Sequence, residues 1–238
     1  MWNSQVRKEN AYLGVQLEPF LRLPPDVYYR KWPLKLTNVD YHFLLSPHDP
    51  CDADTRLVFI SYSVASRFTM RETIRSTWAS VTRQGLWPGS NASYPGIEVF
   101  FMLALSEVPI SKVSAESDRY NDIILADFID SYRNLTLKSL MTLKWMNEHC
   151  KLAHFMVKVD EDIFVNIPRM WSLLERNSMP GSMIGRAMDA KVLRARTSKF
   201  SVPVAQYPFS QYPQYLSGPI YAISAPLIPR LMEVAEYV

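Results

Sequence analysis

Short apolar runs rich in β-forming residues alternate with segments of helical pattern, and this alternation constrains the fold more than any other feature of the chain. The clearest runs are LVFISYS from residue 57, IEVFFMLAL over 97–105 and HFMVKV over 154–159. Helices are expected between and around them, over about 69–80, 112–120 and 134–149. The alternation predicts an α/β domain with a mainly parallel central sheet flanked by helices.

Weaker signals extend the same pattern. A short strand is expected near 123–125, and others over 182–187 and 219–224. Thr69 to Glu72 has the spacing of a capping box, which predicts the start of a helix, and Pro168 suits the first turn of another. A final helix is expected from Pro226.

The first 50 residues differ from the rest of the chain. They contain six prolines among aromatic and charged residues, with no sustained period of 2 or 3.6. We expect residues 1–50 to form an extended, Pro-rich, stem-like arm and residues 51–238 to form the folded domain.

Composition excludes several classes of site. None of the seven glycines stands in GxGxxG or GxxxxGK[ST], so both glycine-rich phosphate loops are excluded. The four histidines form no HExxH and the two cysteines cannot build a Cys-rich zinc site, so any metal would be held mainly by oxygen. A net charge of +3 indicates no nucleic-acid partner, and no run reaches the roughly 18 apolar residues of a membrane span.

The strongest chemical feature is Lys158 followed by Val159 and the acids Asp160, Glu161 and Asp162. The acids lie where a buried strand ends, and in an extended backbone Asp160 and Asp162 point the same way. They suit Mg²⁺ or Mn²⁺, with the phosphates of a substrate completing the ligand shell. Alternatively, the acids solvate a loop and face the next helix. The sequence leaves both readings open.

Two further segments have alternatives of their own. Arg71 and Arg75 share one helix face, where they could grip a diphosphate or form a surface pair with Glu72. The segment 127–138 is polar, and its spacing favours a structural role in which Asp130 or Ser131 caps a helix. Helical spacing also places a set of residues in the core: Ile74, Trp78, Leu137, Leu140, Met141 and Trp145.

Two Asn-x-Ser/Thr sequons begin at Asn91 and Asn134. They would carry glycans only in the secretory pathway. A tyrosine-rich loop over 211–219 could stack on sugar rings or bury at turns, and the sequence does not decide between these.

Taken together, four motifs resemble the β-1,3-galactosyl and N-acetylglucosaminyl transferases of glycosyltransferase family 31, over about residues 51–238. They are RETIRSTW over 71–78, YNDII with DFIDSYRNLTLK over 120–138, KVDEDIFVN over 158–166, and the weaker match over 212–224. Within these motifs Glu161 stands where the family usually has Asp, and Leu216 and Pro219 replace the usual Cys and Gly.

The resemblance implies a GT-A-type nucleotide-sugar-binding fold. It implies a hexosyltransferase that moves galactose or an N-acetylhexosamine from a UDP-sugar to a glycan acceptor on a glycoprotein or glycolipid, in β-1,3 linkage with inversion. Mn²⁺ (or Mg²⁺) would be the cofactor. The location would be the lumenal side of the Golgi membrane, through an anchor absent from this sequence.

The resemblance also assigns residues. It implies Asp162 with Asp160 as metal ligands, and Asp160 and Glu161 as donor-side carboxylates. Arg71, Arg75 and Lys158 would hold the nucleotide or diphosphate. It further implies a disulfide between Cys51 and Cys150.

The resemblance implies a general base beyond Val238 and a membrane anchor before Met1, so the chain is expected to be truncated at both ends. The alternative function is a non-catalytic homologue that binds UDP-sugar or glycan and lacks the base.

Overall fold

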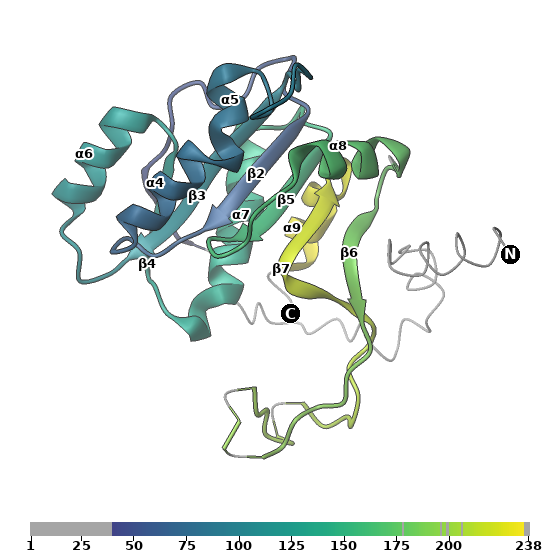
Figure 1. Ribbon diagram of the computed structural model, residues 1–238. Helices are drawn as coiled ribbons and strands as arrows, with labels where there is room; N and C mark the ends of the chain where they lie inside the picture. Colours follow the sequence, from purple (N-terminus) through teal and green to yellow (C-terminus); the bar gives the residue numbers. More distant parts are fainter. Residues whose placement is uncertain (1–39, 178, 196, 199, 206, 236–238) are drawn as a thin grey trace, which may run out of the picture.

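The computed structural model describes residues 40–235, apart from 178, 196, 199 and 206 (Figure 1). Its centre is a seven-stranded sheet in the order β1-β4-β3-β2-β5-β7-β6. The four adjacent strands β4, β3, β2 and β5 are mutually parallel. Their bounds are β2 Leu57–Tyr62, β3 Ile97–Leu105, β4 Ile123–Ile129 and β5 Phe155–Asp160. The predicted mainly parallel sheet is confirmed.

The outer strands run antiparallel to their neighbours. They are β1 (Phe43–Leu45) on β4, β7 (Tyr215–Ser224) on β5, and β6 (Met183–Met188) on β7. Strand β1 lies inside the stretch 1–50 that was expected to form an arm, so the sheet begins earlier than residue 51. The rest of that arm, residues 1–39, lies outside the described part of the chain.

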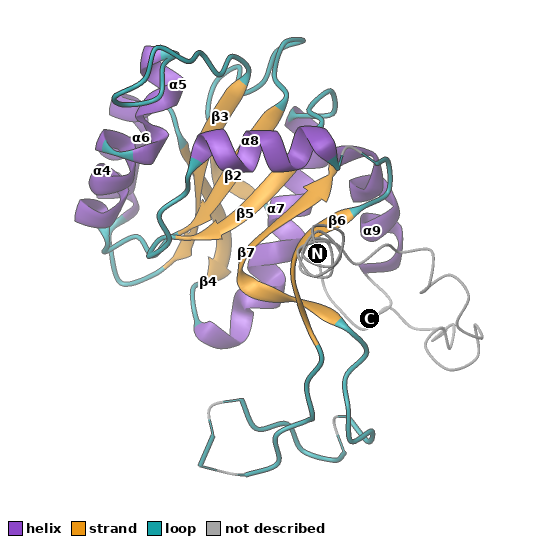
Figure 2. Cartoon of the chain, turned by 45° about the vertical axis from the view of Figure 1, so that its right-hand side comes forward, coloured by secondary structure: helices purple, strands orange, loops and turns teal. Residues whose placement is uncertain are grey.

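Helices cover both faces of the sheet (Figure 2). On one face lie α4 (Phe68–Ser76), α6 (Ile110–Tyr120) and α8 (Ile167–Arg176). On the other lie α7 (Leu135–His149) and α9 (Ile228–Ala235). Short helical segments complete the connections: η1 (Trp78–Ser80), α5 (Val81–Gln84), η2 (Tyr132–Asn134) and η3 (Ala225–Leu227).

Alternate residues of β2 pack into two separate hydrophobic cores, one on each face of the sheet, because successive side chains of a strand point to opposite faces. Phe59 packs edge-on against Trp78, with 5.5 Å between ring centroids, in the core that also holds Ile74. Ile60 belongs to the other core, with Trp145. The predicted burial of Ile74, Trp78, Met141 and Trp145 is confirmed, whereas Leu137 and Leu140 are only partly buried.

Helix starts agree with the sequence in one case and not in another. In α8, Asn166 caps the helix by accepting from the Arg169 amide at 3.1 Å, and Pro168 lies in the first turn as predicted. In α4 the predicted capping box is wrong. Thr69 lies inside the helix, where its carbonyl accepts from Thr73 Oγ1 at 2.9 Å, and the start has no side-chain cap.

The order of the parallel strands reverses between β2 and β5. From β2 the chain adds β3 and then β4 on one side, and it then crosses β2 to add β5 on the other. Ligands of open α/β sheets bind outside the carboxyl ends of the strands at such a switch point, because the connections diverge there. Tyr62 and Asp160, in register at this edge, mark the place.

Candidate functional site

The three adjacent acids lie at the switch point, and each has different surroundings. Asp160, with 39% of its side chain exposed, accepts from the Lys158 ammonium. Glu161, with 11% exposed, accepts a hydrogen bond from Ser63 Oγ at 2.5 Å and forms an ion pair with Arg67, whose Nε lies 3.2 Å from Oε1. Asp162 is exposed and makes no hydrogen bond or ion pair with any described residue.

These contacts explain how three carboxylates can stand side by side. Lys158 and Arg67 place positive charge beside Asp160 and Glu161, which offsets the repulsion among the three acids, and Asp162 is the acid without a cationic partner of its own among the described residues. The described residues contain no group of three His, Cys, Asp or Glu side chains placed to hold a metal. Mg²⁺ in nucleotide sites is commonly held by one or two carboxylates plus phosphates and water, which is the donor set that this turn can supply.

Lys158 joins β5 to β7 beside Asp160. Its buried ammonium also donates to the carbonyl oxygen of Gly218 at 2.6 Å, and it lies 4.7 Å from the centre of the Tyr62 ring. Burial raises the pKa of Tyr62 and of the neighbouring Tyr221, so both phenols are protonated at neutral pH. The carboxylate of Asp160 and the carbonyl of Gly218 together hold the Lys158 ammonium beside the switch point.

Arg71 and Arg75 are placed otherwise than expected, because both side chains are buried. Of the predicted pairing with Glu72, the structure retains one ion pair, 3.7 Å from Arg75 Nη1 to Glu72 Oε2, while the main partners of both arginines lie on other elements. Arg71 donates twice to Glu116, at 2.8 and 2.6 Å, and Arg75 donates to Glu116 and Asp122, each at 2.7 Å. Both arginine side chains are at most 3% exposed. Burial alone would raise the pKa of Glu116, but the hydrogen bonds from the two arginines outweigh it and hold the pKa below its usual value.

The guanidinium of Arg71 has no donor left for a ligand. Besides Glu116 it donates to Ser63 Oγ at 3.0 Å and to the carbonyls of Val64 at 2.7 Å and Ala65 at 3.0 Å. These bonds use all five of its N–H groups. The expected role of Arg71 in gripping the donor is therefore replaced by a structural one, which is to hold the loop that follows β2.

Lys138 is a site residue that the sequence did not single out. Its ammonium, with 2% of the side chain exposed, donates to Asp130 Oδ2 at 2.7 Å and to the carbonyl of Ser63 at 2.9 Å. Burial lowers the pKa of Lys138, and Asp130 partly offsets this. The predicted capping by Asp130 or Ser131 is wrong, since the starts of η2 and α7 have no side-chain cap. The signal in the sequence was that Lys138 stands at an inward-facing position of α7, between apolar residues that pack on the sheet.

A pocket of about 750 Å³ lies at the carboxyl ends of β3 and β4. Asp130 lines this pocket and accepts from Lys138, which also donates to the carbonyl of Ser63, and the hydroxyl of Ser63 donates to Glu161. Its other lining residues are Ser66, Leu105, Ser106, Glu107, Val108, Pro109, Lys112 and Ile129. Ile129 is 70% exposed, so the pocket offers an apolar surface beside a buried carboxylate.

The sequence of this chain is similar to those of known glycosyltransferases. A family model described as Galactosyltransferase matches residues 69–238. The chain belongs to the galactosyltransferase family. It is 33% identical over 193 residues to beta-1,3-galactosyltransferase 1 of Homo sapiens, which covers 78% of this chain and 56% of the relative.

Two other relatives of this galactosyltransferase-family chain carry different sugars in their names. Lactosylceramide 1,3-N-acetyl-beta-D-glucosaminyltransferase of Xenopus tropicalis is 32% identical over 82% of this chain and 53% of the relative. UDP-GalNAc:beta-1,3-N-acetylgalactosaminyltransferase 1 of Sus scrofa is 34% identical over 84% of this chain and 60% of the relative. The chain thus spans little more than half the length of these relatives.

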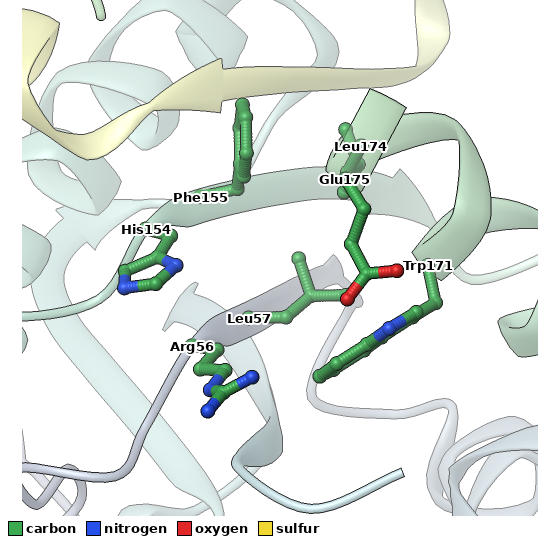
Figure 3. A pocket seen from close by; sticks show the side chains of 7 residues that line it. All are labelled: Arg56, Leu57, His154, Phe155, Trp171, Leu174 and Glu175. Carbon is green, nitrogen blue, oxygen red and sulfur yellow. The ribbon is translucent and has the colours of Figure 1, made fainter. Parts of the chain in front are cut away.

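The galactosyltransferase-family chain has a second, separate pocket at the opposite, amino-terminal edge of β2 and β5 (Figure 3). Its volume is about 320 Å³. It is lined by Arg56, Leu57, His154, Phe155, Trp171, Leu174 and Glu175. None of these residues was a predicted site residue, and the pocket lies at the other end of β5 from Asp160.

The expected disulfide is present in the structure. Cys51 and Cys150 are bonded, with 5.3 Å between their Cα atoms, and the bond joins the segment after β1 to the end of α7. The two sequons differ in their surroundings. Asn91 is exposed, whereas the amide nitrogen of Asn134 donates to the carbonyl of Ile129 at 2.8 Å. Across the described residues, every helix is too short or too polar to cross a membrane.

Proposed function

We propose that this chain carries the donor site of a UDP-sugar-dependent β-1,3-hexosyltransferase. The reaction would move galactose or an N-acetylhexosamine to a glycan acceptor with inversion. One observation carries the proposal: in a chain of the galactosyltransferase family, an acidic turn with one unpartnered carboxylate, Asp162, lies at the switch point of the sheet.

In this proposal Asp162, assisted by Asp160, holds Mn²⁺ or Mg²⁺ together with the donor diphosphate. The exposure of Asp162 supports its part, and Asp160 has one carboxylate oxygen beyond the one that Lys158 holds. When bound, the cation neutralises the charge that builds up on the departing UDP. Lys158 and Glu161 keep the turn in place, and Arg71 and Arg75 take no direct part.

The nucleoside would occupy the 750 Å³ pocket beside the turn. The exposed face of Ile129, with Val108 and Pro109, suits a planar base, and the buried carboxylate of Asp130 suits N–H or hydroxyl donors. Lys138 connects this pocket to the acidic turn. Its ammonium donates to Asp130, which lines the pocket, and to the carbonyl of Ser63, whose hydroxyl donates to Glu161.

The acceptor would approach from the side of β7, where the described residues of the connection between β6 and β7 project from the sheet (Figures 1 and 2). Within it the rings of Tyr207 and Tyr212 lie 4.9 Å apart, and Tyr212 also packs against Tyr215. Aromatic rings of this kind stack on sugars. We give the role of general base to none of the described residues.

We also propose residence on the lumenal side of the Golgi membrane, with the acceptor on a glycoprotein or glycolipid. The disulfide between Cys51 and Cys150 supports an oxidising compartment. Exposed Asn91 is the better placed of the two glycosylation sites, because the amide nitrogen of Asn134 is engaged in a hydrogen bond.

Calorimetric titration of residues 1–238 with UDP, with and without Mn²⁺, tests the donor site. We expect binding that requires the metal. Absence of binding in both conditions would overturn the proposal. Release of UDP from UDP-galactose, UDP-N-acetylglucosamine and UDP-N-acetylgalactosamine in the presence of glycan acceptors then tests turnover. Metal-dependent binding without turnover would favour the non-catalytic alternative.

A further inference from the structure

We infer that the buried hydroxyl of Ser63 is a positioning group for the acidic turn, defined here as residues 160–163. The hydroxyl fixes the Glu161 side chain, and Arg71 fixes the direction of the hydroxyl. The inference deepens the proposed function and rests on it for the role of the turn in donor binding. No motif of the sequence pointed to Ser63.

The direction of the Ser63 hydroxyl follows from counting protons. Arg71 Nη1 donates to Ser63 Oγ at 3.0 Å, so the oxygen acts as an acceptor in that bond. A serine hydroxyl has one proton of its own to donate. Glu161 Oε2 lies at 2.5 Å, and the competing carbonyl of Val64 lies at 3.4 Å, too far to compete. The proton is therefore directed at Glu161.

Arg71 is itself fixed. Its five N–H groups all have acceptors, two of them the oxygens of Glu116, whose side chain is 3% exposed. The carbonyls of Val64 and Ala65 take two more. Because the guanidinium is planar and every N–H is engaged, Arg71 cannot rotate away from Ser63 without breaking several bonds in a buried site.

We call the series of contacts from Arg71 through Ser63 to Glu161 the relay, and it ends at the acidic turn. Glu161 is held at both oxygens, Oε2 by Ser63 and Oε1 by Arg67 at 3.2 Å. The turn closes through the amide of Ile163, which donates to the carbonyl of Asp160 at 3.1 Å. Asp162 lies between these fixed points and has no partner of its own among the described residues. The backbone position of Asp162 is thus set by the anchoring of Glu161 to Ser63 across the switch point and by the bond from Ile163 to Asp160.

The chain offers a matched control two residues before Ser63, on β2 itself. Ser61 is also fully buried, but its hydroxyl has no hydrogen-bond partner. Ser61→Ala therefore removes a buried hydroxyl from β2 without touching the relay. Ser63→Ala removes the relay, and Ser63→Thr retains a hydroxyl at the same position.

The experiment compares these three variants with the wild-type chain by two measurements. Hydrogen exchange of the backbone over 159–165 reports the turn directly, with no ligand present. Titration with Mn²⁺ alone, and with UDP at saturating Mn²⁺, reports the site. We expect Ser63→Ala to exchange about tenfold faster over the turn and to bind Mn²⁺ about tenfold more weakly. Ser63→Thr should restore both values, and Ser61→Ala should match the wild type.

Each result bears on the inference. Ser63→Ala with wild-type exchange over the turn would overturn it, as would an equal effect of Ser61→Ala. Faster exchange with unchanged Mn²⁺ and UDP affinity would reduce Ser63 to a folding role and overturn the positioning role. If the wild-type chain binds no UDP with Mn²⁺, the proposed function fails, and the exchange comparison alone decides whether the hydroxyl holds the turn.

Discussion

Arg75 and Asp122 are joined by two hydrogen bonds of 2.7 Å each, although 47 residues separate them in the sequence. The pair connects α4 to the start of β4, and with Glu116 and Arg71 it forms one buried cluster of charges. Burial alone would lower the pKa of Arg75, but the bonds to Asp122 and Glu116 raise it above its usual value. Arg75 therefore remains charged, and its bonds to Asp122 and Glu116 tie α4 to β4 and α6.

Arg75→Ala should lower the free energy of unfolding by about 3–5 kcal/mol, because it leaves the carboxylate of Asp122 without its arginine and removes one of the two arginines bonded to Glu116. Urea denaturation measures this. The affinity of the folded chain for UDP with Mn²⁺ should be unchanged, since Arg75 does not face the crevice. The control is Arg169→Ala on α8, an exposed arginine whose loss should cost less than about 0.5 kcal/mol. A variant with normal stability and weak UDP binding would restore Arg75 to the donor site.

Asp162→Asn keeps the shape of the side chain and removes its charge. Because Asp162 is exposed and unpartnered in the described structure, stability should change by less than about 0.5 kcal/mol. The Mn²⁺-dependent affinity for UDP should fall by about 100-fold or more, since even substitutions outside the ligand set cost 10–100-fold. Asp118→Asn, an exposed acid on α6, is the control. Unchanged UDP affinity in Asp162→Asn would remove it as a metal ligand.

Glu98 on β3 gives the chain a distinct pH dependence. Burial, with a smaller contribution from the charge of Asp52, raises the pKa of Glu98 to about 7. A carboxyl with a raised pKa in the folded state stabilises at low pH, and this contribution is lost as pH rises from about 4.5 to about 7.

Glu98→Gln should remove that loss. Relative to the wild type, the variant should gain about 1–2 kcal/mol of unfolding free energy between pH 5 and pH 7.5. The gain is smaller than the full pKa shift implies, because water screens the charge of a partly exposed group. Urea titrations at both values measure it. A difference that is constant with pH would contradict the raised pKa.

Gly96 should not tolerate a side chain. Its φ of +71° is in the left-handed region, and an added Cβ would lie 2.2 Å from the carbonyl oxygen of Asp54. Gly96→Ala combines this clash with backbone strain and should cost about 3 kcal/mol or more. Gly89 has a similar φ of +74° and open space around it, so Gly89→Ala isolates the strain alone, at about 1 kcal/mol. Equal losses in the two variants would show that the contact with Asp54 has relaxed.

Reduction of the disulfide should destabilise the chain by about 2–5 kcal/mol, because the bond closes a loop between residues 99 positions apart. The sequence has two cysteines, so a reducing agent acts on this bond alone. The melting temperature with and without dithiothreitol measures the effect, and Cys51→Ser should reproduce it without reductant. A melting temperature insensitive to reductant in the wild type would contradict the prediction.

Much of the architecture was readable from the sequence, because local patterns encode it. The apolar runs at 57, 97 and 154 became β2, β3 and β5 to within a residue or two, since buried parallel strands are continuously apolar. The place of Asp160, Glu161 and Asp162 at the end of a buried strand also followed from the sequence. Strand β1 was not predicted, because three residues are too few to show a period.

What the tertiary structure decided was the role of each charge. The sequence placed Arg71 and Arg75 on one helix face, but their partner Glu116 comes from another helix, 45 and 41 residues away. It placed three acids together, but contacts with Ser63 and Arg67, which lie between β2 and α4, and with Lys158 on β5 leave Asp162 as the acid without a partner among the described residues. Periodicity and apolarity are local, whereas the pairing of buried charges depends on chain segments that meet only after folding.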